Sequence, residues 1–147
     1  MREADPIGGV GSDPFATACT QPTQSGLDGP ASAACDLRVA EAGATFGMPE
    51  VRVGIPSVIE AAILMPLIGL SRAADWVYTG DVIDAAAAER TGFVTRLTPA
   101  GEALTEALAL ARRLAGYSPH ALRLQKALVR RLYYDETIDR AIKLGID

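Results

Sequence analysis

The chain is poor in the residue types that build metal and redox sites, since it contains one histidine and two cysteines among 147 residues. Cys19 and Cys35 lie too far apart for a C-x-x-C zinc or redox motif. A disulfide between the two cysteines is possible in an oxidising compartment, although nothing else in the sequence points to such a compartment. His120 falls in the first turn of an expected helix, where a surface histidine is ordinary and a cation is unfavourable. We therefore predict that the protein has no metal site.

Aromatic residues are also sparse, at 5% of the chain, whereas alanine is abundant. This composition favours closely packed helices over an aromatic-rich β-barrel. The formal net charge of −4 excludes a general electrostatic attraction to nucleic acid or to an anionic membrane. The hydrophobic share of 49% and the charged share of 22% are typical of a globular protein.

Long hydrophobic runs are lacking as well. The apolar run at residues 61–70 is too short to cross a bilayer and contains Pro66. The N-terminus has no basic segment followed by an apolar one, so no secretory signal is recognisable. We therefore expect a cytoplasmic protein without a membrane partner.

Positive charge is concentrated late in the chain, where residues 107–134 contain six basic side chains and no acid. These residues are Arg112, Arg113, Arg123, Lys126, Arg130 and Arg131. Such a cluster can bind phosphate groups, can pair with the acids of the N-terminal half, or can form a solvated helix face. No recognised motif frames it for nucleic acid, which we do not expect as a partner.

Residues 1–30 are rich in glycine, proline and small polar residues and show neither helical nor strand periodicity. This composition is typical of loops or disorder. Ordered structure is expected from about Ala31, with a helical turn at residues 31–35 and short strands at residues 37–40 and 44–47.

A helix is expected after Pro56, because Ser57 and Glu60 form an S-x-x-E capping box before an apolar run. Pro66 is expected to break or kink this helix and Gly69 to end it. Further helices are expected at residues 72–78, with Ser71 as N-cap, and at residues 85–90, with Asp84 as N-cap. A strand is expected at residues 93–97, followed by helices at residues 102–115 and from Pro119 onward.

One acid stands out from its surroundings. Glu50 follows a Gly-x-Pro turn at the end of a run otherwise suited to burial. An unpartnered carboxylate costs several kcal/mol to desolvate, so an acid in apolar surroundings needs a reason. Catalysis, a salt bridge and a surface turn all remain open from the residues alone.

With these elements in order, the chain resembles the enoyl-CoA hydratase/isomerase (crotonase) superfamily over about residues 31–147. Four segments carry the resemblance. They are A-C-D-L-R-V-A at residues 34–40, A-T-F-G-M-P-E-V-R-V-G-I-P at residues 44–56, the stretch from L-I-G-L-S-R through T-G-D-V-I-D to T-G-F-V-T-R-L at residues 67–97, and S-P-x-A-L-x-x-x-K at residues 118–126. The resemblance covers the middle and C-terminal portion of the family, as in an N-terminally truncated chain.

The resemblance implies an α/β fold, a partial crotonase-like ββα spiral of short strands and helices with a mainly helical C-terminal part. It divides the chain into a disordered or non-homologous segment at residues 1–30, a partial crotonase core at residues 31–98 and a C-terminal helical region at residues 99–147. It also implies a homo-oligomer, a trimer or hexamer in the family.

The implied activity is that of an enzyme of acyl-CoA metabolism, which adds water to a 2-enoyl-CoA or shifts its double bond. The thioester substrate itself carries coenzyme A, so no separate cofactor is expected. Family members bind the thioester carbonyl between two backbone N–H groups, which stabilise the enolate. Hydratases of the family use two glutamates and its isomerases can use one. Glu50 matches the glutamate that both kinds use.

The chain departs from the family pattern before residue 31. The place of the family's first glutamate falls near Pro30, and the nearest acid is Asp28. The glycine whose N–H forms half of the oxyanion hole falls near Leu27. Glu60 is either a capping residue or a second carboxylate that replaces the first glutamate. The alternative function is a catalytically incomplete crotonase fragment that only binds CoA or packs with other subunits.

Overall fold

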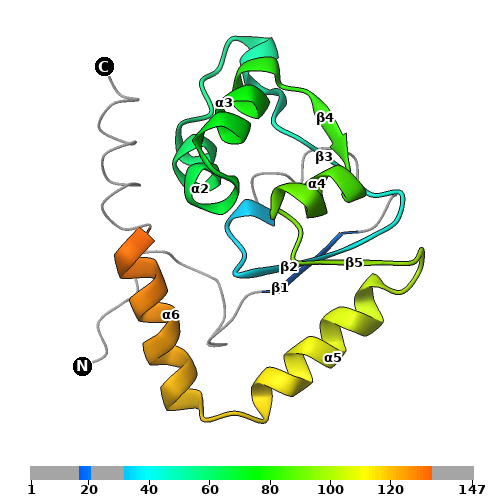
Figure 1. Cartoon of the computed structure of the whole chain (residues 1–147), viewed down its shortest axis with the longest axis vertical. Coiled ribbons are helices and arrows are strands. Elements are labelled where there is room, and N and C mark those ends of the chain that lie inside the picture. The colour runs from blue at the N-terminus through cyan, green and yellow to red at the C-terminus, as the bar shows by residue number, and fades with distance from the viewer. Residues whose placement is uncertain (1–16, 21–31, 134–147) are drawn as a thin grey trace.

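The computed structural model describes residues 17–20 and 32–133 (Figure 1). Its strands are β1 (Thr17–Thr20), β2 (Leu37–Glu41), β3 (Thr45–Gly47), β4 (Val82–Asp84) and β5 (Arg96–Thr98). Its helices are the 3₁₀ helix η1 (Pro49–Val53) and the α-helices α2 (Val58–Ile68), α3 (Leu70–Thr79), α4 (Ala85–Thr91), α5 (Ala103–Ala115) and α6 (Pro119–Tyr133). The predicted α/β class, with short strands and a mainly helical C-terminal part, is confirmed. No described helix is long and apolar enough to span a membrane.

Three parallel strands form the main sheet in the order β1-β2-β5. The chain between β2 and β5 contains α2, α3 and α4 and so forms the crossover that a parallel pair requires. β2 is the central strand, and its last four residues are buried, as expected for a strand with neighbours on both edges and elements on both faces.

A second, two-stranded sheet pairs β3 with β4 in antiparallel register, with Phe46 opposite Ile83. β3 leads directly into η1, and β4 follows α3. This pairing therefore places η1 beside the C-terminal end of α3, as Figure 1 shows above the main sheet.

The core has two parts. The larger part lies between the main sheet and α2, α3 and α4, and it contains Phe46, Trp76 and Phe93. The Phe93 ring contacts Phe46 edge-on at a centroid distance of 5.3 Å and Trp76 at 5.2 Å, the arrangement that aromatic quadrupoles favour. In the smaller part, α5 packs Ala103, Ala107 and Leu110 against Val39 of β2, so the 3.6-residue period sets which face of α5 is buried.

Several helix ends lie where the sequence predicts them. The Asp84 Oδ1 accepts a hydrogen bond of 2.6 Å from the Ala87 N–H, and Gly92 ends α4 in the left-handed conformation. α6 begins at Pro119, and the Ser118 hydroxyl accepts from the Ala121 N–H at 3.4 Å.

Three local predictions differ from the structure in part. α3 begins at Leu70, so Gly69 rather than Ser71 is its N-cap. Of the two outcomes predicted for Pro66, a break does not occur, since α2 continues to Ile68 and ends before Gly69 as predicted. The proline removes only one N–H donor, and the buried Ile63, Leu64 and Ile68 hold the turn in place. The fifth strand starts at Arg96, and the preceding Phe93 and Val94 are core residues.

The sequence also did not predict β1. It lies within residues 1–30, where loop or disorder is indicated, yet it pairs with β2 from Thr17 opposite Leu37 to Thr20 opposite Ala40. A four-residue strand flanked by turn residues has no local signature, and its partner strand determines its conformation. Leu27, Asp28 and Pro30 lie outside the described residues.

Candidate active site

Glu50 lies in the first turn of η1, immediately after β3. Met48 is fully buried between the two elements, and Pro49 supplies the fixed φ that suits the first helical position. The backbone then closes on itself, because the Glu50 carbonyl accepts from the Ile55 N–H at 3.0 Å. Glu50 is half-buried, so its carboxylate is partly withdrawn from water.

The Glu50 carboxylate has a specific partner in Ser57. The Ser57 hydroxyl donates to Glu50 Oε2 at 3.0 Å, and Ser57 is only 9% exposed. Ser57 is the residue before α2, so this bond ties η1 to the start of that helix.

The predicted capping box is therefore wrong in its use of Ser57. Ser57 occupies the N-cap position of α2, but its side chain makes no capping hydrogen bond, because the hydroxyl is directed to Glu50 instead. Glu60 lies in the first turn of α2 and is half-buried. Within residues 32–133, no hydrogen bond or ion pair joins Glu60 to Glu50.

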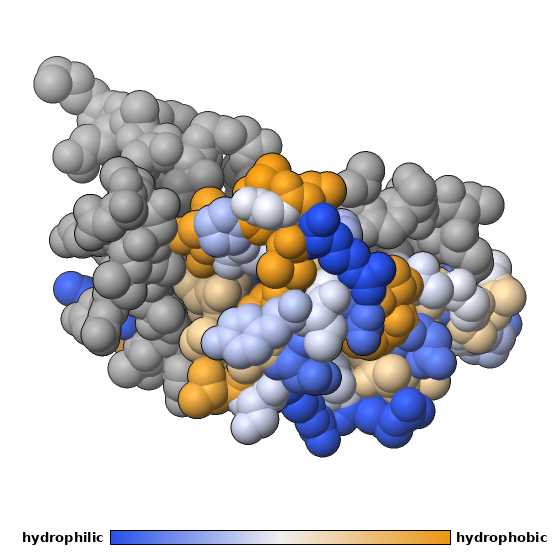
Figure 2. Space-filling model, turned by 90° about the horizontal axis from the view of Figure 1, so that it is seen from above, coloured by the Kyte–Doolittle hydropathy of each residue, from blue (hydrophilic) through white to orange (hydrophobic). Residues whose placement is uncertain are grey.

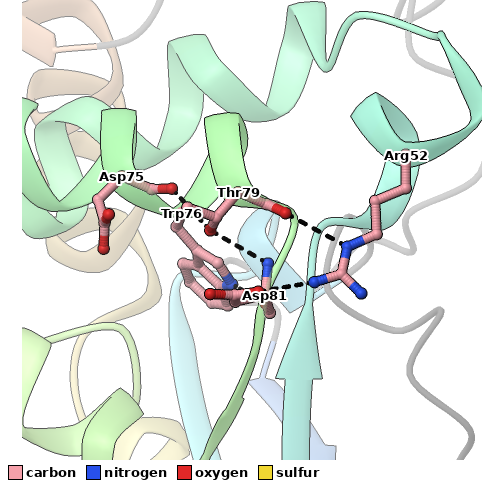
Figure 3. A network of polar contacts seen from close by, with 5 residues as sticks. All are labelled: Arg52, Asp75, Trp76, Thr79 and Asp81. Carbon is pink, nitrogen blue, oxygen red and sulfur yellow. Dashed lines mark hydrogen bonds and ion pairs between the residues drawn. The ribbon is translucent and has the colours of Figure 1, made fainter.

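Arg52 attaches the other side of η1 to the corner between α3 and β4 (Figure 3). Its Nε donates to the Thr79 carbonyl at 3.2 Å, and its Nη2 contacts Asp81 Oδ1 at 2.6 Å. The Asp81 carbonyl accepts from Trp76 Nε1 at 2.8 Å, so this corner is connected to the aromatic core. The Thr79 hydroxyl also accepts from the Asp81 N–H at 3.2 Å. The network fixes the turn that carries Glu50.

Gly80 makes this contact sterically possible. It has a φ of +63°, and a Cβ at this position would lie 3.1 Å from Arg52 Nε and 3.2 Å from Val51 Cγ1. The sequence reasoning missed Arg52 and Gly80 as parts of the site. The available signal was the T-G-D segment at residues 79–81, whose glycine ends a helix.

Arg38 has a structural role in the main sheet. Its side chain is 4% exposed and donates to the backbone carbonyls of Phe93 and Cys35, and it lies over the Phe93 ring at 5.2 Å. Burial raises the pKa of the neighbouring Cys35 thiol, although the positive charge of Arg38 acts against this.

Glu41 is a buried acid that the sequence did not single out. Glu41 ends β2 at 4% exposure, and its Oε2 accepts from the Gly101 N–H at 2.8 Å. This bond fixes the turn before α5 and gives the carboxylate a structural function.

Most of the basic cluster is exposed, on two successive helices, α5 and α6. Arg112, Arg113, Arg123, Arg130 and Arg131 are exposed, as is His120. Within residues 32–133, Lys126 is the one member of the cluster that pairs with an acid of the N-terminal half, through an ion pair of 2.7 Å with Asp36. This pair attaches α6 to the segment before β2.

No group of three or more metal-ligating side chains occurs in the described part of the chain. An open hollow of about 430 Å³ lies between β5 and α5, where Arg96 pairs with Glu106. It does not include Glu50. The turn after Glu50 exposes apolar side chains, with Val53 72% and Ile55 57% exposed. Figure 2, which views the molecule from above, shows hydrophobic and hydrophilic residues side by side on that face.

The family model described as "Enoyl-CoA hydratase/isomerase" matches residues 31–145. A crotonyl-CoA hydratase of Syntrophomonas wolfei is 36% identical over 114 residues, which cover 77% of this chain and 44% of that protein. A short-chain-enoyl-CoA hydratase of Clostridioides difficile is 37% identical over 97 residues, which cover 65% of this chain and 63% of that protein.

Solved structures agree with these relatives. An enoyl-CoA hydratase of Bacillus anthracis is 32% identical with a TM-score of 0.65, and the match covers 78% of this chain and 45% of that one. The chain spans 39–46% of the length of curated relatives from Thermus thermophilus, Mycobacterium bovis and Syntrophomonas wolfei.

Proposed function

The chain belongs to the enoyl-CoA hydratase/isomerase family, and from this premise we propose that it acts on an acyl-CoA thioester with Glu50 as acid and base. The reaction is hydration of a 2-enoyl-CoA or a shift of its double bond. The observation that carries the proposal is the half-buried Glu50 carboxylate, which the Ser57 hydroxyl holds at 3.0 Å beside exposed apolar side chains.

In hydration, Glu50 takes a proton from water as the water oxygen bonds to the β-carbon, and the electron pair of the double bond moves to the thioester as an enolate. Glu50 then returns a proton to the α-carbon, so the sum is addition of one water. In isomerisation, Glu50 removes the α-proton of a 3-enoyl thioester and delivers a proton to the γ-carbon. Both routes need a carboxylate that accepts and releases a proton in place.

The enolate needs hydrogen-bond donors at the thioester oxygen. The Leu27 N–H is proposed as one of them, on the resemblance to the family alone. CoA belongs to the substrate, and the proposal requires no separate cofactor. The names of the curated relatives support hydration, while the single family glutamate of this chain supports isomerisation.

Glu60 is proposed as the second carboxylate of a hydratase mechanism. Its position in the first turn of α2, three residues after the Ser57 that contacts Glu50, supports this role. The Ser57 side chain makes no capping hydrogen bond, so a reciprocal capping box does not account for the presence of Glu60. This supports the role further.

Turnover of crotonyl-CoA and of a 3-enoyl-CoA by the purified chain tests the proposal. The first prediction is that Glu50→Gln lowers kcat by about 100- to 10,000-fold, because the amide cannot take a proton. Glu60→Gln should lower hydration selectively if Glu60 is the second carboxylate. Glu102→Gln, an exposed acid at the start of α5, is the matched control and should leave turnover unchanged. Absence of turnover with both substrates would exclude the enzyme function.

A second candidate function is that of a subunit-packing module. The observation in its favour is a set of exposed leucines on α5 and α6, which are Leu104, Leu108, Leu124 and Leu128. Large exposed apolar side chains that recur along one helix are typical of association surfaces. A homo-oligomer, a trimer or hexamer as in the family, is proposed on the same observation.

A further inference from the structure

Ser57 occupies the N-cap position of α2, where a serine side chain usually caps the helix. At the N-cap of a helix, a serine hydroxyl normally accepts a hydrogen bond from the N–H two or three residues later. α2 begins directly after Ser57, yet the Ser57 side chain makes no such bond. The Ser118 hydroxyl, at the corresponding place before α6, does accept from Ala121. The two serines therefore differ in function although both precede helices.

The hydroxyl of Ser57 is buried and directed at Glu50. Ser57 is 9% exposed, while residues 53–56 before it are all exposed. Its Oγ lies 3.0 Å from Glu50 Oε2 across seven residues of chain. The backbone closes the same loop, because Ile55 donates to the Glu50 carbonyl and Gly54 donates to the Val51 carbonyl. The side-chain bond therefore fixes the carboxylate on a turn whose backbone is already closed.

A hydroxyl suits this place for a chemical reason. It donates to a carboxylate and, after rotation, accepts from a protonated carboxyl group. Beside such a group, a carboxyl that takes and returns a proton has a hydrogen-bond partner for the same oxygen in both states. A lysine or arginine would instead favour the ionised form through its positive charge and could not accept from the protonated form.

We propose that Ser57 is a positioning residue, which gives up helix capping to hold the Glu50 carboxylate in one orientation through both of its protonation states. This inference rests on the proposed function of Glu50. It gives Ser57 no contact with the reacting atoms, and it accounts for the unused cap of α2.

The test compares Ser57→Ala, Ser57→Thr and Ser118→Ala in crotonyl-CoA and 3-enoyl-CoA turnover. Ser57→Ala should lower kcat by about 10- to 100-fold with KM changed by less than about twofold, as for loss of a residue that orients a reacting group. Ser57→Thr restores a hydroxyl and should recover most of the kcat. Ser118→Ala removes a serine hydroxyl that caps a helix and should leave kcat unchanged. An unchanged kcat in Ser57→Ala would overturn the positioning role.

A double-mutant cycle tests the contact without any turnover. The urea midpoints of Ser57→Ala, Glu50→Ala and the double variant should be non-additive, with Ser57→Ala shifting the midpoint much less when Glu50 is absent. Additive shifts would overturn the contact. If the wild type has no turnover but the midpoints are non-additive, the proposed function fails and the Ser57–Glu50 contact stands.

Discussion

At the residue scale, the A-C-D-L-R-V-A segment turns out to serve the fold. Arg38 satisfies backbone carbonyls around Phe93 and Cys35, and Asp36 pairs with Lys126 of α6. A buried arginine is tolerated where several hydrogen bonds compensate for its desolvation. The segment that resembles the family therefore contains residues with structural roles, Arg38 and Asp36. The candidate catalytic Glu50 lies after the next strand, β3.

The Cys35 thiol provides a prediction that depends on pH. Burial raises its pKa in the folded protein, and only the thiolate reacts with iodoacetamide. In a Cys19→Ser background, alkylation of folded Cys35 should therefore rise with pH at a higher pH than in the same protein unfolded in urea. Mass spectrometry over a pH series measures both rates. Coincident pH profiles would contradict the assigned effect of burial.

Ser57 shows how far the site could be predicted from sequence. The S-x-x-E pattern correctly places the start of α2, because helix starts follow local signals. It wrongly assigns the hydroxyl, because a serine before a helix can bond either to the helix or to a neighbouring element, and only the fold brings Glu50 within 3.0 Å. The sequence singled out Glu50 as an acid in apolar surroundings and left catalysis, a salt bridge and a surface turn open, and it did not predict the contact with Ser57.

At the element scale, η1 is held from two sides. Ser57 contacts it from α2, and Arg52 attaches it to the α3–β4 corner. The Arg52–Asp81 ion pair is too exposed to contribute more than about 1 kcal/mol. The hydrogen bonds of Arg52 to the Thr79 carbonyl and to Asp81, which itself accepts from Trp76, serve to hold η1 in place against the α3–β4 corner.

Gly80 tests this attachment. Gly80→Ala should lower the free energy of unfolding by about 1–2 kcal/mol from its positive φ alone, and by more because the new Cβ meets Arg52 and Val51. Gly101→Ala is the control, since Gly101 has a φ of +82° and nothing within 4 Å of the added atom. Urea denaturation should show a larger loss for Gly80→Ala. Equal losses would mean that the Arg52 contact does not constrain the corner.

Elements with local signals were predicted better than those that depend on a partner. The two ends of α4 are determined by residues at those ends, the capping Asp84 and the left-handed Gly92. β1 depends on pairing with β2, and the start of β5 depends on Phe93 being drawn into the aromatic core. Strand pairing and core packing depend on residues far away in the sequence, so four consecutive residues do not reveal them.

At the scale of the whole molecule, the helices that follow the sheet leave apolar surface uncovered. α5 buries one face against β2 but exposes Leu104 and Leu108. α6 is attached to the described core through the Lys126–Asp36 ion pair and exposes Leu124 and Leu128. Full burial of one leucine contributes about 1.5–3 kcal/mol, so two such helices can drive association.

Subunit association is therefore the last prediction. Analytical ultracentrifugation should give a mass of three or six times the 15.4 kDa of one chain. Leu124→Gln combined with Leu128→Gln should weaken the oligomer by about tenfold or more in dissociation constant, because two exposed apolar side chains lose their burial at the interface. The control combines Arg123→Gln with Arg130→Gln, which changes exposed residues of the same helix without removing apolar surface. A monomeric wild type, or equal weakening by both pairs, would show that the α6 leucines do not form a subunit interface.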